Sequence, residues 1–118
     1  MPQKTDTTIL VEELDEYQTL AMATSKQDIT MAQTVDMCAL GLGEAGEVQN
    51  LVKKWLYHGH TLDIRKVLDE LGDVLWYTAV MADALGFDLS YVASQNIEKL
   101  KKRYPQGFSN ASSINRQG

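Results

Sequence analysis

The sequence predicts an all-α protein of four helices, and three observations support this. The two prolines are Pro2 and Pro105, so no proline between them forces a helix to end. Apolar residues recur at three- and four-residue steps through most of that span. The Asn-Gly and Asp-Gly turns typical of β-hairpins are absent. The 118 residues, 44% of them hydrophobic, fit one domain with a core of modest size.

Each expected helix lies between polar capping residues or glycines that would start and end it. Asp28 or Thr30 is a candidate cap for the long second helix, which Gly59 would end. Asp63 or Thr61 is a candidate cap for the third. The four helices are expected over about residues 9–24, 31–57, 64–85 and 90–103. They would form one domain over residues 9–104, between a flexible N-terminus (1–8) and a polar C-terminal tail (105–118).

Composition limits the classes of function. A net charge of −5 argues against a DNA- or RNA-binding protein, which needs a basic surface. It permits a phosphorylated ligand if divalent metal ions lie between the two sets of negative charge. No segment reaches the roughly 18 apolar residues of a transmembrane helix, so we expect a cytoplasmic protein without a membrane partner. The single Cys38 is expected to be a small buried hydrophobe.

Two pairs of acidic residues are the sharpest feature of the sequence. Glu44 and Glu47 are three residues apart and share one helix face, and Glu70 and Asp73 repeat that spacing. If the two helices pack antiparallel, all four carboxylates can converge. Like charges at this spacing repel unless a cation lies between them. Carboxylate oxygens suit Mg²⁺, Mn²⁺ or Ca²⁺, and Mg²⁺ commonly joins carboxylates to phosphates, so Mg²⁺ is the expected cofactor and Mn²⁺ its substitute.

Glycines beside the acids strengthen this interpretation. Gly43, Gly46 and Gly72 lie inside expected helices, where each costs about 0.8–1 kcal/mol relative to Ala. A small residue there would let a second backbone or a ligand approach closely. The alternatives are a solvated acidic face and a di-iron bundle. The second needs Glu-x-x-His pairs, whereas His58 and His60 lie together in an expected loop.

With these residues the sequence resembles the MazG-type all-α nucleotide pyrophosphohydrolases. Three strings carry the resemblance, which covers roughly residues 10–108: Leu40-Gly-Leu-Gly-Glu-Ala-Gly-Glu-Val48, Glu70-Leu-Gly-Asp-Val-Leu-Trp-Tyr77 and Asn96-Ile-Glu-Lys-Leu-Lys-Lys-Arg-Tyr-Pro105. The resemblance implies hydrolysis of a nucleoside or deoxynucleoside triphosphate to the monophosphate and pyrophosphate, with a role in clearing unwanted nucleotides. It also implies a bundle completed by a second copy of the chain, as a homodimer or homotetramer.

Cationic and amide side chains are candidates to bind the phosphates. Lys54 lies seven residues after Glu47, two turns along the same face. On the last helix a shared face carries Asn96, Lys99 and Arg103, at positions that bind phosphate or line the pocket in the family. The alternative for each lysine is a solvated surface charge, and for Arg103 a structural ion pair.

Base recognition and proton transfer have fewer candidates. Tyr77 follows Asp73 by one turn and is expected to contact the base or sugar, with core packing as the alternative. Gln18 is a candidate for a base edge because relatives place that face over the pocket. Glu47 is the candidate general base. A non-catalytic oligomerisation module and a nucleotide sensor that turns over slowly remain the alternative functions.

Overall fold

The computed structural model describes residues 11–107. Within them all regular secondary structure is helical, apart from an isolated bridge between Pro105 and Gly107. The five helices are α1 (Leu14–Ala23), α2 (Met31–Gly43), α3 (Gly46–Tyr57), α4 (Ile64–Ala84) and α5 (Leu89–Arg103). The all-α prediction is confirmed, with five helices in place of four in the described part of the chain. None of these helices is long and apolar enough to span a membrane.

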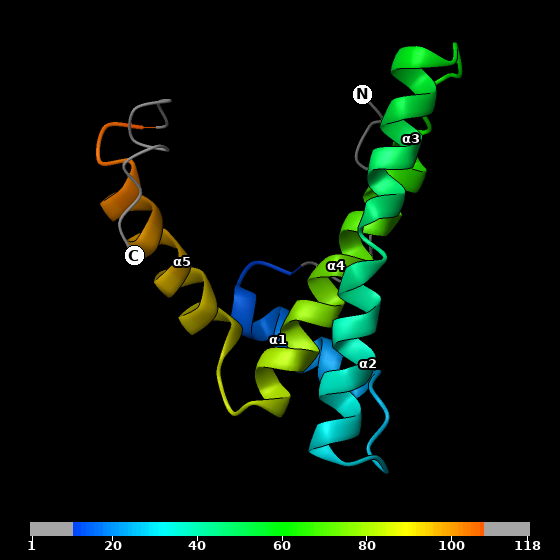
Figure 1. The fold of residues 1–118 in the computed structure, drawn as a ribbon. Helices are drawn as coiled ribbons and strands as arrows, with labels where there is room; N and C mark the ends of the chain where they lie inside the picture. The colour runs from blue at the N-terminus through cyan, green and yellow to red at the C-terminus, as the bar shows by residue number, and fades with distance from the viewer. Residues whose placement is uncertain (1–10, 108–118) are drawn as a thin grey trace.

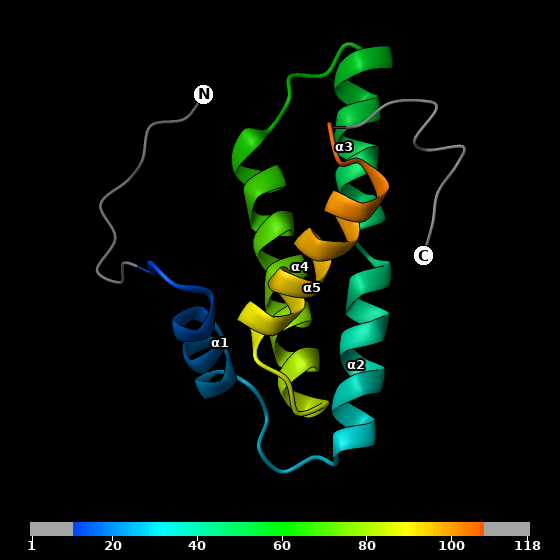
Figure 2. The same ribbon diagram turned by 90° about the vertical axis from the view of Figure 1, so that its left-hand side faces the viewer.

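Helix α4 is the central element of the fold. It lies between α1 on one side and α2 with α3 on the other (Figure 2). Helices α2 and α3 follow one another along α4 and run opposite to it, whereas α5 diverges from α4 so that the molecule is V-shaped (Figure 1). The buried core lies where α1, α2 and α4 meet the start of α5, and it consists of Ala21, Cys38, Ala79, Val80 and Leu89. The expectation of a buried Cys38 is confirmed, since it is 0% exposed.

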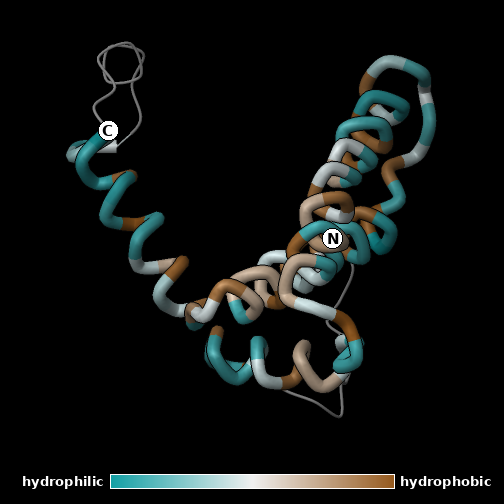
Figure 3. Tube along the Cα trace, turned by 60° about the horizontal axis from the view of Figure 1, so that its bottom comes forward, coloured by the Kyte–Doolittle hydropathy of each residue, from teal (hydrophilic) through white to brown (hydrophobic). Residues whose placement is uncertain are grey.

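Large apolar side chains remain exposed outside this core. Hydrophobic residues recur along α5 and along the projecting part of the molecule formed by α3 and the facing half of α4, here called the α3–α4 arm (Figure 3). The exposed ones on these helices include Trp55, Leu56, Leu68, Leu71, Leu75, Tyr91, Val92, Ile97 and Leu100. Within residues 11–107 a single chain therefore leaves much apolar surface in contact with water, which is unfavourable at about 25 cal/mol per Å².

The first two expected helices differ from the observed ones. Helix α1 begins at Leu14 with Glu13 as its N-cap, so its expected start near residue 9 is wrong: residues 11–13 are not helical. Asp15 and Glu16 then lie in its first turn, where the helix dipole favours negative charge. The flexible N-terminus expected over 1–8 and most of the expected tail lie outside the described residues.

The single long helix expected over residues 31–57 is interrupted at Glu44 and Ala45. Here each of Glu44, Ala45 and Glu47 donates its backbone N–H to the carbonyl three residues earlier, at 3.0–3.1 Å. This tighter hydrogen-bonding pattern breaks the helix into α2 and α3. Gly43 and Gly46 flank the break, and both disfavour helix. The acid-rich motif therefore lies at a change of helix geometry, which sequence periodicity does not reveal.

Two helix starts and one helix end follow the local sequence closely. Thr30 caps α2 through a reciprocal capping box with Gln33. The Asp63 carboxylate accepts from the Lys66 N–H at 3.1 Å and caps α4. Gly59 has φ +71°, a left-handed conformation that suits glycine and ends α3 as expected. Of the two alternatives for each cap, the structure selects Thr30 and Asp63.

Helix α1 anchors the start of α5. The Asp15 carboxylate accepts from the Ser90 backbone N–H at 2.8 Å and from its hydroxyl at 2.7 Å. The Gln18 Oε1 accepts from the Leu89 N–H at 2.9 Å. These bonds satisfy N–H groups that a helix start otherwise leaves without an intrahelical partner, and they connect α5 to α1 where α5 leaves the rest of the fold.

The Asp15–Ser90 contact predicts a loss of anchoring in acid. The Ser90 hydroxyl and backbone N–H hold the pKa of Asp15 below its usual value of 3.8. A carboxyl whose pKa is lowered by folding stabilises the fold above the unfolded-state pKa, and that contribution disappears as pH falls through the lower folded-state pKa. We expect the stability difference between wild type and Asp15→Ala to be constant above the unfolded-state pKa of the carboxyl and to shrink as pH falls through its lower folded-state pKa. Urea unfolding across this range measures it. A difference independent of pH would contradict the contact.

A glycine sets the register of α2 against α4. A Cβ atom at Gly41 would overlap the ring of Tyr77, so the buried Gly41 backbone serves as the surface on which that ring packs. Tyr77 also meets Trp76 edge to face, with ring centroids 5.4 Å apart. The close helix approach that we expected at Gly43, Gly46 or Gly72 occurs instead at Gly41.

Gly41→Val is expected to destabilise the chain by about 1–3 kcal/mol, because the Tyr77 ring must leave its position against α2. Urea unfolding of the variant measures the loss. The matched control is Gly72→Ala, in mid-helix with no atom within 4 Å of the added methyl group, which should be more stable than wild type by about 0.8–1 kcal/mol. Equal stabilities for Gly41→Val and wild type would contradict the claim that the Tyr77 ring leaves no room for a side chain at position 41.

Candidate metal and nucleotide site

The four acidic residues lie on the antiparallel arm formed by α2, α3 and α4. Glu44 follows the last residue of α2, and Glu47 is in the first turn of α3. Glu70 and Asp73 are on α4. Glu70 is half-buried, within a half-buried stripe formed by Val67, Glu70, Val74 and Tyr77, whereas the other three carboxylates are exposed. Glu70 therefore lies on the face of α4 that packs in the fold.

The Gly41–Tyr77 contact places the two acidic pairs at the same level along the axes of the antiparallel helices. Helices α2 and α4 run in opposite directions (Figures 1 and 2). Glu44 lies three residues after Gly41, and Asp73 lies four residues before Tyr77. Because the two helices are antiparallel, both acids are about one turn from the Gly41–Tyr77 contact in the same direction. By the same counting, Glu47 and Glu70 are about one turn beyond them. The antiparallel arrangement that convergence of the acids requires is present.

The carboxylates have the chemistry of a Mg²⁺ site but are not gathered into one. Among residues 11–107, no group of three or more His, Cys, Asp or Glu side chains is close enough to hold a metal ion. The donors are oxygens only, which suits a hard cation. A Cβ atom at Gly43, Gly46 or Gly72 would meet nothing within 4 Å. The space in front of these backbones is therefore open to a ligand or to a second chain.

Tyr17 on α1 is a neighbour of the acids that sequence analysis missed. Burial and the negative charge of Asp73 raise the pKa of the Tyr17 phenol. Both effects favour the neutral phenol, so Tyr17 keeps a hydroxyl proton beside the acidic pair on α4. No spacing rule connects Tyr17 with Asp73, because only the packing of α1 on α4 brings them together.

Lys54 lies in a pocket at the end of the α3–α4 arm. This pocket has a volume of about 300 Å³ and is lined by Asn50, Lys53, Lys54, His58 and His60. Asn50 and Lys54 continue the helical face of Glu47 at steps of three and four residues. The candidate phosphate ligand Lys54 therefore shares a helix face with Glu47.

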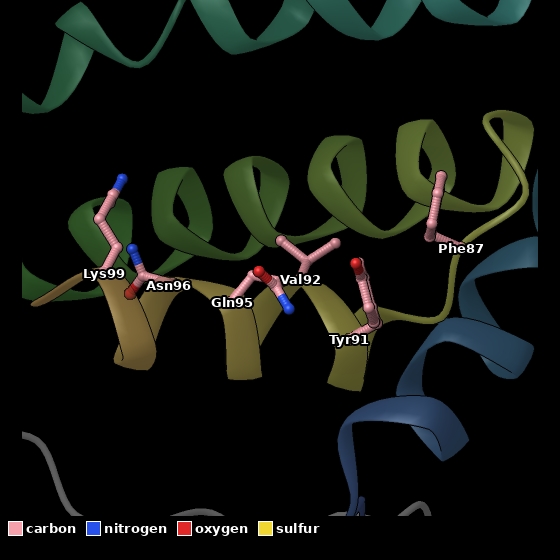
Figure 4. A pocket seen from close by; sticks show the side chains of 6 residues that line it. All are labelled: Phe87, Tyr91, Val92, Gln95, Asn96 and Lys99. Atoms are coloured by element: carbon pink, nitrogen blue, oxygen red, sulfur yellow. The ribbon is translucent and has the colours of Figure 1, made fainter. Parts of the chain in front are cut away.

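Asn96 and Lys99 line a different pocket, along α5. It has a volume of about 550 Å³ and is lined by Phe87, Tyr91, Val92, Gln95, Asn96 and Lys99. In Figure 4 the Asn96 and Lys99 side chains extend from α5 toward the side on which α4 lies. Phe87 and Tyr91 stack with centroids 5.1 Å apart and an interplanar angle of 25°.

Phe87, Tyr91 and Gln95 were not singled out from the sequence. Tyr91, Gln95 and Lys99 follow one another at four-residue steps on α5, which the sequence shows, whereas Phe87 precedes the helix. Arg103 is half-buried in the last turn of α5. Because α5 diverges from α3 (Figure 1), the candidate phosphate ligands fall into two separate pockets, and the single chain does not bring Lys54 together with Asn96 and Lys99.

Both candidate base-binding residues have structural contacts. Tyr77 is half-buried and packs on Gly41, as described above. Gln18 is 5% exposed, and its Nε2 donates to the carbonyls of Ala79 and Phe87 at 3.1 and 3.0 Å. Gln18 would have to give up these bonds to donate to a base. In this structure it links α1 to α4 and α5.

Comparisons with known proteins identify the family of this chain. Residues 32–108 match the MazG nucleotide pyrophosphohydrolase domain. The chain belongs to this family. It is 37% identical over 94 residues to the Gene 37 protein of Mycobacterium phage L5, an alignment that covers 75% of this chain and 82% of that protein. No solved structure gives a significant match. The matched region contains all four acids, α5 and both pockets, and it extends past the expected domain boundary at residue 104.

Proposed function

We propose that this MazG-family chain hydrolyses a nucleoside or deoxynucleoside triphosphate to the monophosphate and pyrophosphate in a Mg²⁺-dependent reaction. The family is that of a nucleotide pyrophosphohydrolase. The observation that carries the proposal is the matching height of the Glu44–Glu47 and Glu70–Asp73 pairs on antiparallel helices. Removal of unwanted nucleotides from the cellular pool is the role that we propose for this activity.

The proposal assigns a task to each group of residues. Glu44, Glu47, Glu70 and Asp73 would hold the Mg²⁺ after rotation of their side chains, which are mostly exposed. Mg²⁺ bound there would neutralise phosphate charge and polarise the phosphorus that is attacked. Glu47 would accept the proton of the attacking water. Lys54 would bind a phosphate oxygen as a charge-assisted donor.

A second copy of the chain would complete the site. Helix α5 carries Asn96, Lys99 and Arg103 away from the acids of its own chain (Figure 1), and apolar residues are exposed on α3, α4 and α5. Packing of another copy against these faces would bury them and would supply phosphate ligands from its own α5. We therefore propose a homodimer or homotetramer as the active form.

One observation favours the alternative of a non-catalytic helical module. The acids of the described chain do not form a coordination shell, and a chain without a metal shell could still bind partners through its apolar faces. This alternative predicts no turnover of any nucleotide under conditions in which the protein is folded and oligomeric.

A product assay separates the two functions. The common nucleoside and deoxynucleoside triphosphates are incubated with the chain and Mg²⁺ or Mn²⁺, and the products are resolved. Monophosphate with pyrophosphate, abolished by EDTA, would support the proposed reaction. Diphosphate with phosphate would indicate another hydrolase, and no turnover would favour the non-catalytic module. Sedimentation analysis of the same sample tests the oligomer, and a monomer that is fully active would contradict the shared site.

A further inference from the structure

The end of the α3–α4 arm carries lysine and histidine residues that the proposed reaction does not use. Lys53, His58 and His60 line the same pocket as Lys54, and Asn50 contributes an amide. Within residues 11–107 no ion pair or side-chain hydrogen bond occupies the ammonium groups of Lys53 and Lys54. The pocket therefore offers several free donors to a ligand.

The backbone explains why these side chains lie together. Both His58 and His60 donate their backbone N–H groups to the Lys54 carbonyl, each at 3.1 Å. The bond from His60 spans six residues and folds the chain back over the last turn of α3, with Gly59 in the left-handed conformation that this motif requires. The two histidines are thereby held at the end of the helix that carries Lys53 and Lys54.

Local charge makes the pocket attractive to an anion although the whole chain has a net charge of −5. No Asp or Glu occurs between Val48 and Leu62. The next acid, Asp63, caps α4 by accepting from the Lys66 N–H. An anion at the end of α3 also meets a partial negative potential from the helix dipole, which the positive charges of Lys53 and Lys54 oppose.

The pocket also has a defined position relative to the acids. Glu47, Asn50 and Lys54 follow one face of α3, and the seven residues from Glu47 to Lys54 span about 10 Å of helix. A polyphosphate whose metal lies at Glu47 can therefore extend along this face toward the pocket. The ligand that fits is a chain of phosphate groups, because it offers many acceptor oxygens and several negative charges to donors of the Lys and His type.

We propose that Asn50, Lys53, Lys54, His58 and His60 form a subsite for the pyrophosphate portion of the substrate, which leaves from this subsite after cleavage. This inference rests on the proposed function, because it takes the metal at the acids as its reference point. It assigns specificity for polyphosphate length to the loop between α3 and α4. The nucleoside would then lie on the other side of the acids.

Titration of the full chain with inorganic pyrophosphate in Mg²⁺ tests the subsite directly. We expect the imidazole NMR signals of His58 and His60 to shift on addition of pyrophosphate. His60→Gln and Lys53→Gln are each expected to weaken pyrophosphate binding about five-fold, the scale of one exposed charged contact. Lys101→Gln, an exposed cation on α5 outside both pockets, is the matched control and should bind as wild type does. Unchanged imidazole signals, or equal weakening in Lys101→Gln, would overturn the subsite.

Product inhibition distinguishes the subsite from the proposed function. If the chain turns over triphosphates, His60→Gln should raise the inhibition constant of pyrophosphate about five-fold and leave that of the nucleoside monophosphate unchanged. Turnover with an unchanged pyrophosphate constant would refute the subsite alone. If no nucleotide is hydrolysed while pyrophosphate still shifts both imidazoles, the proposed reaction fails and the anion site stands. If the nucleoside monophosphate shifts the imidazole signals and pyrophosphate does not, the substrate lies in the opposite orientation. That result would overturn the assignment of this pocket to pyrophosphate.

Discussion

Asp73→Asn is expected to lower kcat/KM for pyrophosphate release by about 100-fold or more while the fold stays intact. The amide keeps the shape of the side chain but removes one of the negative charges proposed to hold Mg²⁺. Stabilisation by a metal ion is worth several kcal/mol in the transition state, and each 1.36 kcal/mol corresponds to a factor of ten in rate. Asp73 is exposed, so the substitution leaves no unpaired group in the core.

Asp69→Asn is the control for this prediction. Asp69 is an exposed acid on the same helix, outside the four proposed ligands, and the variant loses the same charge. We expect wild-type activity from it at both saturating and limiting Mg²⁺. If the Asp73→Asn variant remains fully active at limiting Mg²⁺, Asp73 is not a metal ligand. If both variants lose the same activity, the effect is one of general charge.

Gln18→Leu is expected to destabilise the chain by about 2–5 kcal/mol. Leucine has a similar volume but no polar atoms, so the buried Leu89 N–H and the partly buried Phe87 carbonyl would lose their hydrogen bonds to Gln18. Each buried polar group left without a partner costs about 1–3 kcal/mol. Because these groups position the start of α5, we expect the end of α4 and the start of α5 to lose protection first in hydrogen exchange.

The same substitution at an exposed site isolates this effect. Gln49→Leu on α3 changes the same atoms at a solvent-exposed position and should change the free energy of unfolding by no more than about 0.5 kcal/mol. Urea unfolding of both variants supplies the comparison. If Gln18→Leu unfolds as wild type does, the link from α1 to α5 does not stabilise the fold.

Local features of this fold could be predicted because they depend on neighbours in the sequence. The caps at Thr30 and Asp63 and the stop at Gly59 each involve residues within one or two turns of one another. The three-residue spacing within each acidic pair likewise follows from helix geometry alone. The family was predicted from the same motifs, and the match over residues 32–108 confirms it.

Other features could not be predicted because they join distant parts of the chain. Gln18 bonds to groups 61 to 71 residues away, and no local pattern marks it as a link in place of a base contact. The glycines likewise could not be sorted from the sequence. Gly43 and Gly72 lie beside the acidic residues, where we expected a close approach of two backbones, yet the glycine that packs against another helix is Gly41. Its importance depends on the Tyr77 ring on another helix.

The sequence by itself determined the helical class, the caps at Thr30 and Asp63, the stop at Gly59 and the two acidic pairs, since each arises from side chains within a few residues of one another. Only the tertiary structure decided how the pairs relate in space, because the packing of Tyr77 on Gly41 sets the register of α2 against α4. It also decided that α5 carries Asn96 and Lys99 away from Lys54. The direction of α5 depends on bonds from α1 to Leu89 and Ser90, and such long-range contacts leave no periodic signal in the chain.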